Sequence, residues 1–323
     1  MRQTTVRPAS EPTRFRPGRS PARRLRAVRR REREREAGGA ATFAHCSRRL
    51  RAVRRRERER EAGGAATFAH CLHAEWIKIR TMRSTLHVLL GTLAFCAGLA
   101  ALNGSSAGDE FAGLSPADQA VFDPLATSLR GYLIAQITLG LLGGLVITSE
   151  YGARTIVSTL ASVPHRGRVL TSKAVVLVAV AFPTGLMVSS TGFLVGQAAL
   201  SGAGAPHLTL SDGEALRGIF GGGLYLALAG LFGLALGTVI RSTTATVTTL
   251  FGVMLIVQPF APALPGGLGD WVTTYWPPIA GGQIITSYQD PDLLTPWAGL
   301  GVMAGCVAVM MGAAHAVFRK RDA

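Results

Sequence analysis

Long apolar runs separated by short polar segments occupy most of the chain after residue 84. Six of these runs approach or exceed the roughly 20 residues that a helix needs to cross the hydrocarbon core of a bilayer. The runs cover residues 85–102, 131–148, 174–199, 218–240, 244–264 and 297–318. The pattern predicts an all-α membrane protein with six transmembrane helices. The fifth helix should kink or end early, because it contains Pro259 and Pro262.

Positive charges flank these runs unevenly. With the N-terminus placed inside, only Arg130 and Arg217 of the Lys and Arg residues after position 71 fall on the outer side. The excess on the inner side satisfies the positive-inside rule. We therefore expect a multi-pass plasma-membrane protein, with the lipid bilayer as its surroundings and both termini in the cytoplasm.

Residues 1–71 differ in composition from the rest of the chain, since they hold 21 Lys and Arg against 7 Asp and Glu. Residues 23–46 are repeated without change as residues 48–71. A unit dominated by Arg and Glu has no apolar face to bury against a neighbour, so a solenoid is excluded. We interpret this part as a disordered basic extension without a nucleic-acid partner, followed by a transmembrane domain at 72–323. A polybasic arm attracted to anionic lipids is the alternative.

Residue patterns for catalysis or cofactor binding are missing. The four cysteines form no CxxC pair, and neither HExxH nor GxSxG occurs, so we expect no catalytic or metal site. No GxxxxGK[ST] loop is present to hold ATP phosphates. The middle of each predicted span also lacks Asp, Glu, Lys and Arg, which disfavours an ion-coupled carrier. The chain is thus not expected to be an enzyme.

Aromatic residues crowd the segment before the sixth run, where Trp271, Tyr275, Trp276 and Trp297 suit the headgroup level of a membrane. Residues 277–288 within it are too short to span. The segment is either a partly inserted outer hairpin or an ordinary interfacial loop.

The connection between the second and third runs carries an apolar stripe. Ile156, Leu160 and Val163 recur at helical spacing, and Pro164 ends the pattern. This spacing predicts a two-turn amphipathic helix on the cytoplasmic side. From spacing alone, the helix could lie flat on the bilayer or contact another protein.

Two motifs resemble one transporter family. Residues 150–173 read EYGARTIVSTLASVPHRGRVLTSK and resemble the pattern EY..GTI...L...P..R...L..K that follows the second span in ABC type-2 permeases, the membrane subunits of ABC exporters. Arg154 stands where Gly is frequent. Residues 72–85, LHAEWIKIRTMRST, are similar to the AEW.K.R..RST segment before the first span of actinobacterial members.

The resemblance implies a permease subunit of an ATP-binding cassette exporter, which forms the translocation pathway. It would pair with itself or with a similar permease and with separate ATPase subunits, which would bind ATP and Mg. The segment after the second span would be a cytoplasmic coupling helix that docks on the ATPase, and the first segment would be an interfacial entry helix. The implied coupling residues are Glu150, Tyr151, Gly152, Arg154, Thr155, Ile156, Leu160, Val163, Arg166 and Arg168. The implied entry residues are Glu75, Trp76, Lys78 and Arg80.

Two other functions stay open at this stage. The chain could be a secondary transporter or channel that needs no ATPase. It could also be a non-transporting membrane anchor whose basic tail recruits a partner.

Overall fold

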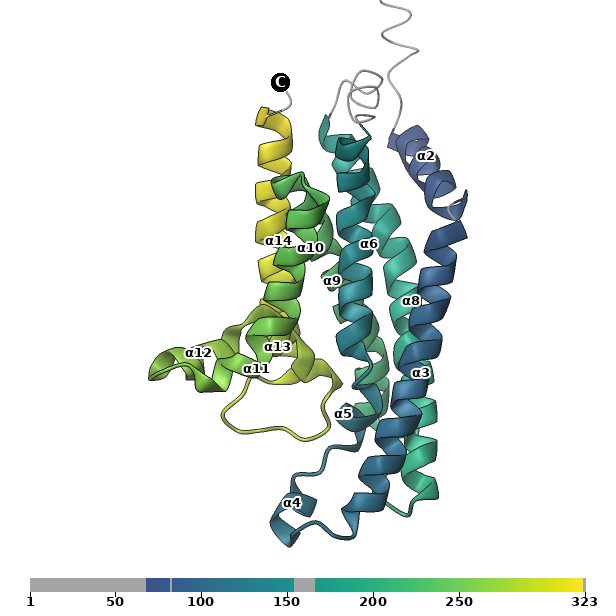
Figure 1. Cartoon of the computed structure of the whole chain (residues 1–323), viewed down its shortest axis with the longest axis vertical. Coiled ribbons are helices and arrows are strands. Elements are labelled where there is room, and N and C mark those ends of the chain that lie inside the picture. Colours follow the sequence, from purple (N-terminus) through teal and green to yellow (C-terminus); the bar gives the residue numbers. More distant parts are fainter. Residues whose placement is uncertain (1–67, 82, 154–165, 322–323) are drawn as a thin grey trace, which may run out of the picture. The chain divides into compact units, whose positions relative to one another are not determined.

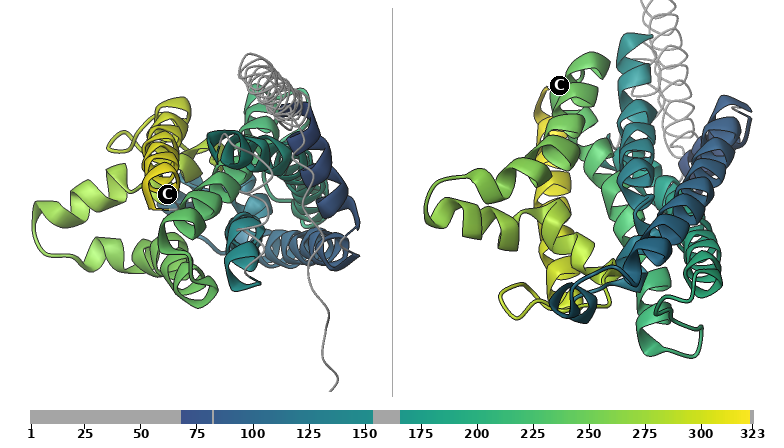
Figure 2. Two further views of the ribbon diagram at one scale, coloured as in Figure 1. Left: turned by 90° about the horizontal axis from the view of Figure 1, so that it is seen from above. Right: turned by 60° about the horizontal axis from the view of Figure 1, so that its bottom comes forward.

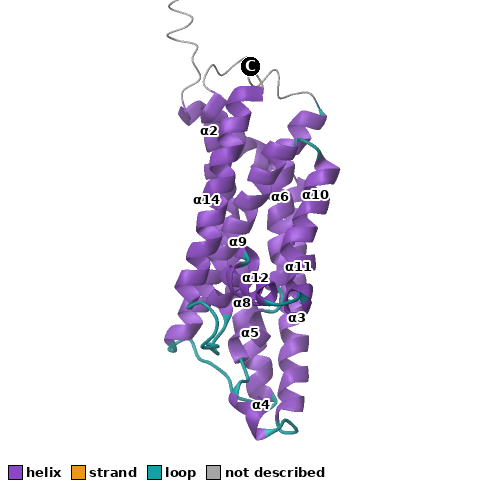
Figure 3. Ribbon diagram, turned by 90° about the vertical axis from the view of Figure 1, so that its left-hand side faces the viewer, coloured by secondary structure: helices purple, strands orange, loops and turns teal. Residues whose placement is uncertain are grey.

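The computed structural model describes residues 68–81, 83–153 and 166–321. In this part of the chain every regular element is a helix, and no strand occurs (Figure 3). Within the same ranges, six helices are long and apolar enough to cross a membrane. The predicted all-helical architecture with six membrane-length helices is therefore confirmed. The predicted coupling helix falls on residues 154–165, outside the described residues, as does the predicted tail up to residue 67.

The six membrane-length segments are labelled in Figure 1. They are α3 (Arg83–Phe111), α6 (Tyr132–Gly152), α8 (Arg166–Gly202), α9 (Gly213–Ile240), the segment Thr243–Ala263 and α14 (Pro296–Arg321). The shorter elements are α2 (Phe68–Thr81), α4 (Pro116–Ala120), α5 (Pro124–Leu129), α12 (Gly267–Tyr275), α13 (Pro277–Gly282) and the 3-10 turn Gln283–Ile285.

Close packing of α6 against α9 forms the centre of the bundle, and α9 is the most buried of the six segments. Glycines on both helices make this approach possible. A Cβ added at Gly143 would lie 1.9 Å from the carbonyl oxygen of Gly230, and one at Gly233 would lie 1.9 Å from that of Gly140. No side chain fits at such distances, so the two backbones are in direct contact. Small residues are the usual means of this packing between membrane helices.

Several helices extend beyond the apolar runs that predict them. The first spanning helix continues to Phe111, because Gly104 and Gly108 pack closely against α8. The third begins at Arg166 rather than at residue 174, because Val169 and Leu170 are buried in the bundle. Lys173, which the sequence pattern places in the flanking loop, consequently lies inside this helix.

Helix α2 (Phe68–Thr81) includes the boundary predicted after residue 71. Within it, Cys71 is buried in an apolar cluster that also contains Leu170 and Phe318. The division of the chain at residue 71 stays a prediction.

The fifth segment is irregular, as its prolines predict. It consists of α10 (Thr243–Phe251), a π-helical turn at Gly252–Ile256, α11 (Val257–Phe260) and a 3-10 turn at Ala261–Ala263. Backbone carbonyls in the π-helical turn accept side-chain hydrogen bonds. Gln136 Nε2 donates to Met254 O at 3.2 Å, and Trp276 Nε1 donates to Val253 O at 2.9 Å. These bonds hold the irregular turn against α6 and the following hairpin.

The hairpin after the fifth segment is helical rather than a loop. Helix α13 packs between α9 and α14, and a Cβ added at Gly299 would lie 2.0 Å from the carbonyl oxygen of Ala280. Helix α12 extends away from the other helices (Figure 2) and exposes Leu268, Trp271 and Tyr275. Residues 277–282 therefore pack against the helix bundle, and both predicted alternatives for residues 277–288 stay predictions.

Candidate functional site

Helix α2, the end of α6 and the start of α8 lie at the same end of the bundle (Figure 1). Four charged side chains from these helices contact one another there. We call them the charge cluster: Glu75, Lys78, Glu150 and Lys173. Two of its members come from the predicted entry helix and one from the predicted coupling segment. The fourth, Lys173, belongs to the matched motif but was not among the predicted site residues.

Lys173 is the centre of the charge cluster. Its side chain is 0% exposed, and its Nζ donates to Glu75 Oε1 at 2.8 Å and to Glu150 Oε1 at 2.7 Å. A longer contact of 3.5 Å joins the same nitrogen to the carbonyl oxygen of Val146. An ammonium group has three donors, and these three acceptors use all of them.

Glu150 lies in the last turn of α6 with its side chain only 3% exposed. A negative charge near a helix C-terminus is unfavourable, because the carbonyl groups there already carry partial negative charge. The two ammonium groups compensate: Lys173 and Lys78 both donate to Glu150 Oε1. Two acids and two bases make the charge cluster neutral, which is the condition for burying it at tolerable cost.

The predicted entry residues divide between two faces of α2. Glu75 and Lys78 are three positions apart and therefore lie on the same face, toward α6 and α8. Trp76 is 43% exposed, and Arg80 is also exposed. The entry helix thus contacts the bundle through its charged pair and leaves the indole ring of Trp76 at the surface.

The remaining predicted coupling residues lie apart from the charge cluster or outside the described part. The Arg241 guanidinium, at the left-handed C-cap of α9, lies 5.2 Å from the ring centre of Tyr151. Such a distance is within the range of a cation–π contact. Gly152 and Arg168 are exposed. Outside the described residues, or with undescribed side chains, are Arg154, Thr155, Ile156, Leu160, Val163 and Arg166.

A mostly apolar cavity of about 490 Å³ lies beside the charge cluster. Glu75 and Lys78 line one part of it, and Leu141, Leu142 and Leu145 of α6 line another. The charge cluster therefore borders a space between α2, α3 and α6 instead of being surrounded by side chains on every side.

The chemistry of this site is ionic and structural. Among the residues that the structure describes, no three His, Cys, Asp or Glu side chains come together as a metal-binding group. The charge cluster connects three helices through hydrogen-bonded charges and so links their relative positions.

No protein-family model matches the chain, and no curated protein matches it significantly. The described part of the chain is helical, and its six long apolar helices are consistent with a multi-pass membrane protein.

Proposed function

We propose that this chain is the permease subunit of an ATP-binding cassette exporter of the plasma membrane, with both termini in the cytoplasm. Two such subunits, identical or similar, would form the translocation pathway together with two separate ATPase subunits. The observation that carries the proposal is the charge cluster. It connects the helix before the first span to both helices that flank the proposed coupling segment at residues 154–165.

The position of the charge cluster suits the transmission of a movement. Helix α6 ends at Gly152 and α8 begins at Arg166, so any force on the intervening segment acts first on these two helix ends. Glu150 and Lys173 lie within two to three turns of that segment, and Glu75 extends the connection to α2. Coupling between two sites requires an element whose arrangement both sites influence. The charge cluster is our candidate for this element.

The distribution of buried charge also supports the proposal. Among the described residues, the buried charged side chains are Glu75, Glu150 and Lys173, and all belong to the charge cluster near one end of the bundle. An ion-coupled carrier usually keeps such groups along its pathway through the membrane. This chain contains no phosphate loop for ATP, so hydrolysis of ATP by a partner subunit would supply the energy for transport.

A secondary transporter or channel is the second candidate. Buried ionisable side chains such as Lys173 occur along the pathways of such proteins, although here they lie near one end of the bundle. In that case the chain would function without an ATPase. The third alternative, a membrane anchor with a basic recruitment tail, gives the charge cluster a purely structural role.

Purification of the tagged chain from its native membranes in a mild detergent tests the proposal. We expect a phosphate-loop ATPase to co-purify in an amount comparable with the chain, as shown by quantitative mass spectrometry. A detergent-solubilised six-span protein of unrelated sequence is the control for non-specific recovery. A chain recovered intact without any ATPase would contradict the proposal and favour the other two functions.

A further inference from the structure

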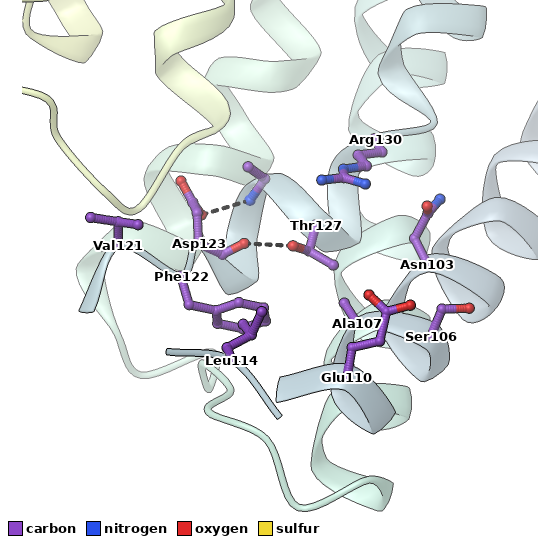
Figure 4. Close-up of a pocket in the computed structure, with 11 residues that line it drawn as sticks. Asn103, Ser106, Ala107, Glu110, Leu114, Val121, Phe122, Asp123, Thr127 and Arg130 are labelled. Atoms are coloured by element: carbon purple, nitrogen blue, oxygen red, sulfur yellow. Dashed lines mark hydrogen bonds between the residues drawn. The ribbon is translucent and has the colours of Figure 1, made fainter. Parts of the chain in front are cut away.

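A second cavity, of about 500 Å³, lies at the end of the bundle opposite the charge cluster. Its walls come from the last turns of α3, from α5 and from the segment between them. Figure 4 shows the Glu110 carboxylate and the Arg130 guanidinium directed into the same space from two sides. The volume is within the range of small-molecule sites in proteins.

Neither Glu110 nor Arg130 pairs with another side chain among the residues that the structure describes. No hydrogen bond or ion pair joins the side chain of Glu110 or Arg130 to another residue in the described part of the chain. Both side chains are exposed, so they reach the space of the cavity and its solvent. A negative and a positive group that face one cavity without pairing match a ligand that carries both charges.

The third charged side chain in the wall is already occupied. Asp123 caps α5 by accepting from Ala126 N at 2.8 Å. It also accepts from the backbone nitrogens of Ser287 and Tyr288, at 2.9 and 3.0 Å. These bonds fix the wall of the cavity to the segment before α14, and they leave Glu110 and Arg130 as the available charges.

The rest of the lining provides weaker polar groups and an apolar side. Asn103 and Ser106 stand on α3 near Glu110, while Leu114, Val121 and Phe122 form the opposite wall (Figure 4). The Phe122 ring is held by edge-to-face packing on Phe111, with ring centres 5.0 Å apart. The apolar wall is therefore preorganised to contact a hydrophobic group.

We propose that this cavity binds a small zwitterion that carries an ammonium group, an acidic group and an apolar side chain. Glu110 would bind the ammonium, Arg130 the carboxylate or phosphate, and the wall at Leu114, Val121 and Phe122 the apolar part. A guanidinium group can donate two parallel hydrogen bonds to one carboxylate or phosphate group. This site is separate from the charge cluster, and its assignment does not depend on the proposed function.

Three probes of the same skeleton test the assignment by titration calorimetry on the purified full chain: leucine, N-acetylleucine and leucine methyl ester. Leucine has both charges, the acetyl derivative only the carboxylate, and the ester only the ammonium. We expect leucine to bind with the highest affinity. Glu110→Gln should lower the affinities for leucine and for its ester by about tenfold, because a hydrogen bond to a charged group contributes about that factor. The affinity for N-acetylleucine should not change. Arg130→Gln should lower the affinities for leucine and N-acetylleucine by about tenfold and leave the affinity for the ester unchanged.

Asp109→Asn is the matched control, because Asp109 is an exposed acid on the same helix but does not line the cavity. It should leave all three affinities unchanged. Since Glu110 and Arg130 are exposed, their variants should keep the thermal unfolding midpoint of the wild type. Absence of saturable leucine binding, or equal losses for all three probes in each variant, would overturn the proposal.

A lipid headgroup can present the same pair of charges. Titrations of leucine in nanodiscs of phosphatidylethanolamine and of phosphatidylglycerol distinguish the two sources. If the affinity for leucine is lower in phosphatidylethanolamine than in phosphatidylglycerol, and Glu110→Gln removes this difference, the zwitterion site is supported with lipid as its occupant. Equal binding in both discs would support it with a soluble ligand as the occupant.

Discussion

Lys173 Nζ lies 2.7 Å from Glu150 Oε1, and the two side chains are almost completely removed from solvent. The residues belong to the two helices that flank residues 154–165. A buried ion pair at this position holds the two helix ends together and, through Glu75, holds α2 against them.

Replacing Lys173 with Met is expected to destabilise the protein by about 3–5 kcal/mol, because it leaves two buried carboxylates without their shared cation. The measurement is thermal unfolding of the purified protein in detergent. The triple variant Lys173→Met, Glu75→Gln, Glu150→Gln is the control, and it should regain most of the loss since no uncompensated carboxylate remains. An unchanged unfolding midpoint in Lys173→Met would contradict the assigned role of the charge cluster.

The members of the charge cluster should differ in importance. Glu150 accepts from both lysines, whereas Glu75 accepts from Lys173 in the described contacts. Glu150→Gln should therefore lower the unfolding midpoint more than Glu75→Gln. Lys78→Ala should cost at most about 1 kcal/mol, because the Lys78 side chain is 46% exposed and its charge is screened by solvent. In the same unfolding assay, a larger loss for Glu75→Gln than for Glu150→Gln would contradict this order. A loss for Lys78→Ala larger than that for Lys173→Met would show that Lys78, not Lys173, dominates the charge cluster.

Gly233→Ala should disrupt the contact between α6 and α9. The added Cβ would lie 1.9 Å from the carbonyl oxygen of Gly140, so the two backbones must separate. We expect a loss of about 1–3 kcal/mol or more in stability, as for other overpacked interiors. Gly98→Ala is the matched control on α3, since a Cβ there meets nothing within 4 Å. Equal unfolding midpoints for the two variants would argue against the close packing.

Removal of residues 1–67 should leave membrane insertion and ATPase binding intact, because a sequence dominated by Arg and Glu offers no apolar face to bury. Removal of residues 1–71 additionally deletes Cys71, a buried member of the apolar cluster that also contains Leu170 and Phe318, and should lower stability. Membrane fractionation and thermal unfolding of both truncations check this prediction. Loss of membrane insertion in the variant that lacks residues 1–67 would show that the basic extension is required for the fold.

The number and approximate position of the membrane-length helices could be predicted from the apolar runs. Their ends could not, because the ends are stabilised by packing that hydropathy does not register. Helix α3 continues through the polar residues 103–111, and α8 starts eight residues before its apolar run. In both cases, glycines or buried aliphatic side chains pack against a neighbouring helix and extend the helix into the polar flank.

The charge cluster could be predicted in part. The two motifs indicate Glu75, Lys78 and Glu150, but the apolar pattern places Lys173, the partner of both carboxylates, in a loop. Lys173 is 98 residues from Glu75 and 23 from Glu150, so their contact depends on how three helices pack. The one available signal was the position of Lys173 at the end of the matched motif. The sequence therefore does not show which of these charges pair, because their contacts form only when the three helices pack together.

The amount of phosphate-loop ATPase recovered per chain, compared between the wild type and Leu160→Asp, tests the proposed permease function most directly. Leu160 belongs to the apolar stripe predicted from the sequence, and Ser158→Asp, off that stripe by helical spacing, is the matched control. We predict comparable amounts of ATPase and chain for the wild type and Ser158→Asp, and recovery at background level for Leu160→Asp although the variant is inserted in the membrane. Ile156→Asp should behave in the same way as Leu160→Asp. Recovery of no ATPase with the wild type, or of equal amounts with Leu160→Asp, would contradict the account.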